Sequence, residues 1–179
     1  MAAGVTLALV LGSPLRVLSH FTIQTDIVVT AVFTVSAWRT WTARRPLPLS
    51  VTTGALLYAM GAGLAHHVFL ATGSSAVSVT GGTQAPTGWH AVTSQLLHTA
   101  VPIMAALDWL LLTRPGPLRL HTAAVWLAFP AAYLTFALAR GALLSPDAPD
   151  RYLYPFLDVP RHGYVEVLGN ATVLALVGA

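Results

Sequence analysis

Apolar segments long enough to cross a lipid bilayer make up most of this chain. Crossing roughly 30 Å of hydrocarbon takes about 20 helical residues at 1.5 Å per residue. Four segments reach that length, at residues 20–41, 49–71, 89–113 and 120–144. Only 8% of the residues are charged, whereas soluble domains average about 25%. The sequence therefore predicts an all-α, polytopic transmembrane bundle that forms a single integral-membrane domain over residues 1–179.

Both ends of the chain carry shorter apolar segments. Residues 2–11 and 163–179 fall below the length of about 20 that a full span needs, and we interpret them as abbreviated outer helices. Six spans, with short first and last ones, is the predicted count, and five is the alternative. Neither a basic start nor a small-residue cleavage site marks the N-terminus as a signal peptide.

The arginines predict how the bundle is oriented. Arg39, Arg44 and Arg45 share one connection, Arg114 and Arg119 share another, and residues 72–88 carry no charge. Arginine-rich connections lie on the cytoplasmic side of a membrane, here the bacterial plasma membrane. The chain has no cysteine for a disulfide framework. It has no basic tract either, so we expect no nucleic-acid partner.

In this orientation, polar side chains from four spans share one depth near the outer leaflet. Ionisable groups inside a membrane are rare and costly, so each is a functional-site hypothesis. The group comprises Thr22, Gln24, Asp26, His66, His67, His98 and Glu166. His66 and His67 point about 100° apart on a helix, so at most one of them faces a given site. The shared depth predicts one polar site that opens toward the outer leaflet.

Threonine and histidine at this depth suggest nucleophilic chemistry. A threonine hydroxyl is a weak nucleophile until a base lies beside it, and imidazole titrates near neutral pH. We predict Thr22 as nucleophile and His98 as base, with Asp26, His66 or Glu166 orienting the imidazole, as in a catalytic triad. The simpler interpretation of Thr22 is a hydrogen bond to its own helix backbone. A site in the outer leaflet would take lipid-like esters.

Other interpretations remain open. His66, His98, Asp26 and Glu166 are acceptable zinc ligands, although no span carries an HxxH or HxxxH pair. Haem between His66 and His98 is a further option. Glu166 and Asn170 lie one turn apart and could join helices by hydrogen bonds. Residues 61–63, Gly-Ala-Gly, predict close helix packing. A non-enzymatic protein that binds a lipid headgroup, or conducts protons or solute, is the main alternative to an enzyme.

Several motifs resemble one known family, and together they cover nearly the whole chain from about Phe21 onward. They are Phe21-Thr22-Ile23-Gln24-Thr25-Asp26, His98-Thr99-Ala100-Val101-Pro102 running on to Asp108-Trp109-Leu110, Pro130-Ala131-Ala132-Tyr133, Arg140-Gly141, Tyr154-Pro155-Phe156-Leu157-Asp158, and Gly163-Tyr164. The set resembles the bacterial predicted six-transmembrane membrane-protein family. That family is similar in turn to the animal androgen-induced and androgen-dependent transmembrane proteins.

The resemblance implies a six-span bundle and a specific reaction. The animal proteins are intramembrane threonine hydrolases that cleave fatty acid esters of hydroxy fatty acids. For this chain we therefore expect a hydrolase that needs no metal or cofactor. Their nucleophile corresponds to Thr22 and their essential histidine to His98. Two departures are the Asp26 carboxyl, where bacterial members usually carry Asn, and the Tyr-Pro-Phe-Leu-Asp motif, which is weaker in the animal proteins. We expect residues 151–158, with Tyr152, Tyr154 and Asp158, to form an interfacial lid over the outer opening.

Overall fold

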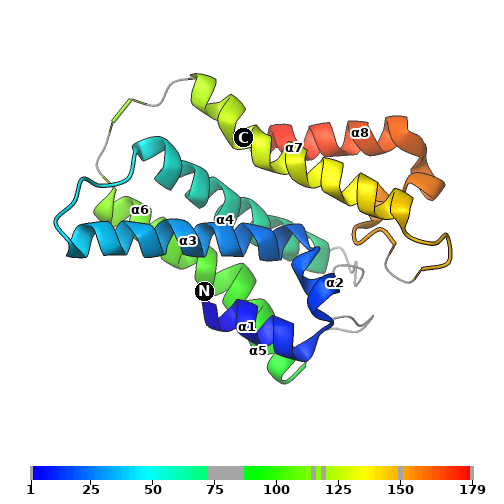
Figure 1. The fold of residues 1–179 in the computed structure, drawn as a ribbon, viewed down its shortest axis with the longest axis horizontal. Helices are drawn as coiled ribbons and strands as arrows, with labels where there is room; N and C mark the ends of the chain where they lie inside the picture. Colours follow the sequence, from blue (N-terminus) through cyan, green and yellow to red (C-terminus); the bar gives the residue numbers. More distant parts are fainter. Residues whose placement is uncertain (1, 72–86, 114–115, 118–119, 149–150, 178–179) are drawn as a thin grey trace. The chain divides into compact units, whose positions relative to one another are not determined.

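The computed structural model describes residues 2–71, 87–113, 116–117, 120–148 and 151–177, and no strand occurs among them. The helices are α1 (Ala2–Leu11), α2 (Pro14–Leu18), α3 (Phe21–Trp41), α4 (Leu49–Ala71), α5 (Trp89–Gln95), the π-helix η2 (Leu96–Ala100), α6 (Val101–Leu112), α7 (Leu120–Leu143), the 3₁₀ turn η3 (Pro155–Leu157) and α8 (Val159–Val177) (Figure 1). The chain forms two compact units, Met1–Leu118 and Arg119–Ala179, which are considered separately below.

The all-helical class is confirmed for the described residues. Three helices are long and apolar enough to cross a membrane: Phe21–Trp41, Trp89–Leu112 and Ala124–Leu143. Ala2–Leu11 is a shorter apolar helix. Large apolar side chains such as Leu110, Leu111 and Leu143 are exposed, as expected of surfaces that face lipid tails. Most of the uncharged connection, together with Arg114, Arg119 and Asp150, lies outside the described residues.

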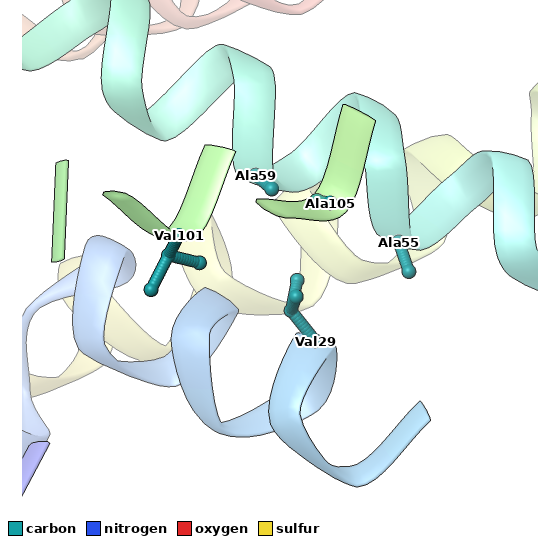
Figure 2. Packing of buried hydrophobic residues seen from close by; sticks show 5 residues of the cluster. All are labelled: Val29, Ala55, Ala59, Val101 and Ala105. Carbon is teal, nitrogen blue, oxygen red and sulfur yellow. The ribbon is translucent and has the colours of Figure 1, made fainter. Parts of the chain in front are cut away.

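Two apolar clusters hold the first unit together. Ala8, Val17, Ile23 and Leu97 form the first, which joins α1, α2, α3 and η2. The second consists of Val29, Ala55, Ala59, Val101 and Ala105 and joins α3, α4 and α6 (Figure 2). Three of its members are alanines, and small side chains let helix backbones approach closely in lipid. Both clusters include α3 and the continuous helix formed by η2 and α6, and α4 packs against both of these segments.

The second unit consists of α7, η3 and α8. Gly163 interrupts α8 with φ 74° and ψ 160°, a conformation that side-chain-bearing residues rarely adopt. The segment before α8 is fastened to the end of α7 by two arginines. Arg151 Nε donates to the Gly141 carbonyl at 2.6 Å, and Arg140 donates to the Arg151 carbonyl at 3.0 Å.

Candidate functional site

The buried face of α3 carries polar groups that lack partners. Thr22, Thr25 and Asp26 are spaced three and four residues apart, which places them on one side of the helix, and all three are buried. Neither the Thr22 hydroxyl nor either carboxylate oxygen of Asp26 has a hydrogen-bond partner among the described residues. A buried polar group without a partner costs about 1–3 kcal/mol. Thr22 therefore lacks the backbone hydrogen bond that its simpler interpretation required.

His98 lies in a π-helical turn that Pro102 explains. A proline at this position has no N–H to donate to the carbonyl four residues earlier, and its ring crowds that carbonyl. The carbonyl in question is that of His98, and the N–H of Val101 bonds instead to the Leu96 carbonyl, five residues back. The imidazole is 3% exposed, and its Nδ1 has no hydrogen-bond partner in the part of the chain that the structure describes. Single π-helical turns inside α-helices are frequent at functional sites.

Gly63 of α4 packs directly against this turn. A Cβ at residue 63 would lie 2.9 Å from the His98 carbonyl oxygen and 2.7 Å from the Pro102 ring. No atom of the described residues lies within 4 Å of the same position on Gly61. The close-packing face predicted for residues 61–63 therefore depends on Gly63 and the buried Ala62. The absence of a side chain at Gly63 lets α4 approach the backbone of His98.

The two apolar clusters place Thr22 and Asp26 at the level of His98. Ile23, next to Thr22, shares a cluster with Leu97, next to His98. One helical turn beyond Asp26, Val29 shares the second cluster with Val101, three residues after His98. The buried hydroxyl, carboxyl and imidazole therefore occupy one layer between these contacts. No hydrogen bond joins them, although catalytic hydrogen bonds are often long or misaligned in the absence of substrate.

Further histidines surround His98. The His66 ring stacks on it with centroids 4.0 Å apart and planes 20° from parallel. His67 is exposed and contacts His66 edge to face at 5.5 Å. His66, rather than His67, is thus the member of the adjacent pair that faces the site. His20 is 1% exposed, and its Nδ1–H donates to the Arg16 carbonyl at 2.9 Å.

Hydroxyl groups on α5 and η2 hold the His66–His67 pair. Ser94 Oγ lies 2.9 Å from His66 Nε2, and Thr99 Oγ1 lies 3.1 Å from His67 Nε2. The sequence analysis did not single out Ser94 or Thr99 as site residues, nor His20. The available signal was the position of Thr99 directly after His98 and of His20 directly before the Phe21-Thr22 motif. Ser94 had no comparable signal, because only the packing of α4 against α5 brings it to His66.

The other candidate side chains have local partners. Gln24 donates its amide to the Leu18 carbonyl at 3.0 Å and so ties α3 to the end of α2. In the second unit, Glu166 is exposed and pairs with His162 at 2.9 Å, and the partly exposed Asn170 follows one turn later. Orientation of His98 by Glu166 stays a prediction.

The expected lid residues pack within the second unit. Tyr154 is buried against Tyr133, with ring centroids 6.3 Å apart. Tyr152 lies where any side chain at Gly141 would overlap its ring. The Asp158 carbonyl accepts the N–H of His162 at 3.0 Å and so opens α8. Residues 151–158 are therefore an ordered strap on α7, and its covering of the site stays a prediction.

The geometry gives no support to the metal hypothesis. Within the described ranges, no three His, Asp or Glu side chains are arranged to hold a metal ion. Parallel stacking of His66 on His98 also differs from the convergence of ring nitrogens that a tetrahedral zinc site requires.

Comparison with known proteins adds no relative to this picture. No protein-family model, no curated protein and no solved structure matches the chain. The family resemblance of the sequence motifs therefore stays an expectation. The structure itself shows a buried hydroxyl, carboxyl and imidazole, those of Thr22, Asp26 and His98, in the first unit.

Proposed function

We propose that this protein is an integral-membrane hydrolase of lipid esters, with Thr22 as nucleophile and His98 as general base. One observation carries the proposal: the Thr22 hydroxyl, the Asp26 carboxyl and His98 Nδ1 are all buried in the first unit without hydrogen-bond partners among the described residues. Buried polar groups are nearly always paired, and each exception needs an explanation. A catalytic site that waits for a polar substrate explains three such exceptions together.

The reaction follows from these groups. Thr22 Oγ attacks the ester carbonyl carbon while His98 accepts the hydroxyl proton. The C–O bond to the alcohol part breaks, and the leaving alkoxide takes that proton from the imidazole. Water then releases the acyl group from Thr22, again with His98 as base. Asp26 orients and stabilises the imidazole, as the acid of a triad does.

The substrate class follows from the surroundings and from the family resemblance. A bundle with apolar outer surfaces admits its substrate from the lipid phase, which favours fatty acid esters of hydroxy fatty acids or similar lipid esters. In the proposed topology six spans cross a bacterial plasma membrane and the site faces the outer leaflet. Beside the three candidate spans, this topology takes three further helices: α4, at about 34 Å in length, and the short helices α1 and α8. Residues 151–158 form the lid, and no cofactor takes part.

Turnover of a lipid-ester panel by the protein in nanodiscs tests the proposal. Thr22→Val keeps the side-chain shape and removes the hydroxyl, and His98→Ala removes the base. Thr25→Val is the matched control, because Thr25 is also buried on α3 with an unpartnered hydroxyl. We expect Thr22→Val and His98→Ala to abolish turnover, Thr25→Val to retain it, and a chelator to leave it unchanged. Thermal unfolding checks that each variant is folded.

A second candidate function is a non-enzymatic protein that binds a lipid headgroup or conducts protons. The absence of a hydrogen bond between Thr22 and His98 favours this second function, because a catalytic nucleophile usually lies within hydrogen-bond reach of its base. This alternative predicts that neither the wild type nor the Thr22→Val variant turns over lipid esters. Turnover that survives Thr22→Val would therefore contradict the threonine mechanism.

A further inference from the structure

Two hydroxyl–imidazole hydrogen bonds join α4 to the neighbouring helix, and neither includes Thr22, Asp26 or His98 as a partner. Ser94 pairs with His66, and Thr99 pairs with His67. Both histidines come from one turn of α4, and both hydroxyls come from the continuous helix formed by α5 and η2. A serine or threonine beside an imidazole on another element is the arrangement of an activated nucleophile. In membrane helices it is also a common interhelical contact, so the direction of each bond decides.

The directions of the two bonds differ. The Thr99 hydroxyl donates its only proton to Gln95 Oε1 at 2.8 Å. Thr99 must therefore accept from His67 Nε2–H, and that nitrogen has no free lone pair to act as base. Ser94 has no such competing acceptor among the described residues, so its proton is available to His66 Nε2 when His66 carries its own proton on Nδ1. Of the two pairs, only Ser94 and His66 can take the direction that a nucleophile and its base need.

His66 is also held from its other side. Its ring stacks on the buried His98 ring at a centroid distance of 4.0 Å. Stacking fixes the plane of the imidazole, as the third group of a triad does by a hydrogen bond. We propose that Ser94 and His66 form a second nucleophile–base pair, which accepts acyl groups from carboxylic esters whose carbonyl lies near the membrane surface. This activity goes beyond the proposed function and does not require Thr22.

The position of the pair defines the substrate class. Ser94 and His66 are both partly exposed, whereas Thr22 and His98 are buried. Ser94 follows the exposed Trp89 by five residues, about 7.5 Å along the helix, and tryptophan prefers the boundary between membrane and water. A short-chain ester that partitions to this boundary can reach Ser94 without entering the layer of His98. The expected substrates are therefore short carboxylic esters rather than long-chain lipid esters.

The acylation step is balanced as follows. Ser94 Oγ bonds to the ester carbonyl carbon, and the Ser94 proton moves to His66 Nε2. The ester C–O bond then breaks, and the leaving alcohol takes the proton from His66. The product is an acyl-serine with neutral His66, which water hydrolyses by the same route. No oxidant, reductant or metal enters the step.

Acyl-enzyme mapping tests this proposal on the full chain in nanodiscs. The probe is 4-nitrophenyl butyrate, with acid quenching, proteolysis and mass spectrometry to locate the butyryl group. We expect the group on Ser94, in the wild type and also in Thr22→Val. Ser94→Ala should lower the burst of 4-nitrophenol by about 10²-fold or more, the range of a lost general-base-assisted step. Thr93→Val is the matched control and should leave the burst unchanged, because the Thr93 hydroxyl donates to the Trp89 carbonyl of its own helix at 2.9 Å.

The outcomes separate this proposal from the proposed function. Butyrylation of Thr22 alone would overturn the Ser94 proposal and support the threonine mechanism. Butyrylation of a histidine alone, with a burst that Ser94→Ala does not change, would also overturn it, since bare imidazole reacts with such esters. Butyrylated Ser94, in a protein that turns over no lipid ester, would support the second pair and contradict the first site. The wild-type mapping needs no variant, so the test holds even if Ser94→Ala fails to fold.

Discussion

Two carboxylates of apolar helices, Asp26 of α3 and Glu166 of α8, occupy opposite environments. Asp26 is 1% exposed, and neither of its oxygens has a hydrogen-bond partner among the described residues. Glu166 is 58% exposed, and His162 lies one turn away at 2.9 Å. A paired, exposed carboxylate is ordinary helix-surface chemistry worth a few tenths of a kcal/mol. Burial without a partner, rather than the presence of a carboxylate in an apolar helix, therefore marks the candidate site.

Replacement of Asp26 should separate stability from function most clearly. Asp26→Leu removes a buried, unpartnered polar group, so we expect the free energy of unfolding to rise by about 1–3 kcal/mol. Lipid-ester turnover should fall by about 10²-fold, since His98 loses its orienting acid. Thermal unfolding and turnover in nanodiscs measure both effects. An Asp26→Leu protein that is less stable yet fully active would contradict the environment assigned to Asp26.

Gly63 and Gly61 of α4 are a matched pair of positions that tests how closely α4 packs against the turn of His98. Gly63→Ala places a methyl group against the His98 carbonyl and the Pro102 ring, and overpacking of this kind costs about 1–3 kcal/mol. Gly61→Ala meets open space and should stabilise the helix by about 0.5–1 kcal/mol. Thermal unfolding of both variants is the measurement. Equal effects at the two positions would show that α4 does not pack closely on this turn.

The π-helical turn offers a test of how His98 is placed. Pro102→Ala restores an N–H that can bond to the His98 carbonyl, so residues 96–100 should return to α-helical hydrogen bonding. The imidazole then rotates out of its layer, and turnover should fall by about tenfold, a modest misplacement effect. Backbone ¹³C shifts of residues 96–102 report the change of hydrogen bonding. Unchanged turnover in a variant whose turn has become α-helical would show that the π-helical turn is not needed for function.

Glu166 should give the smallest effect. Glu166→Gln removes one member of an exposed pair, and we expect the free energy of unfolding to change by at most about 0.5 kcal/mol. Turnover should stay at the wild-type level. His162→Gln is the companion variant and should behave in the same way. If Glu166→Gln abolished turnover, Glu166 rather than Asp26 would be the residue that orients His98.

Hydropathy alone predicted the helices well, for a physical reason. Segments 20–41 and 89–113 correspond to α3 and to α5 through α6 within two residues at each end, because long apolar runs and their polar boundaries are local properties. The interruption inside the second of these was missed. Pro102 was its signal, but proline can kink a helix or widen a turn, and sequence alone does not select between them.

The candidate site was predictable only in part. Thr22, Asp26 and His98 were recognisable as polar residues at similar depth, and they are buried. The stacking of His66 on His98 and the hydrogen bond from Ser94 depend on how closely α4 approaches its neighbour. That approach is set by Gly63 and by small residues such as Ala59, whose partners lie about 40 residues away in the sequence. Such contacts leave no periodic pattern in a single chain.

The most direct test of the central claim is to find where a long-chain acyl group resides during turnover. Wild-type protein in nanodiscs is incubated with a fatty acid ester of a hydroxy fatty acid, quenched in acid and mapped by mass spectrometry. We predict an acyl group on the peptide that contains Thr22, and its loss in Thr22→Val. Turnover with no acyl group on that peptide, or with unchanged rate in Thr22→Val, would contradict the assignment of Thr22 as nucleophile.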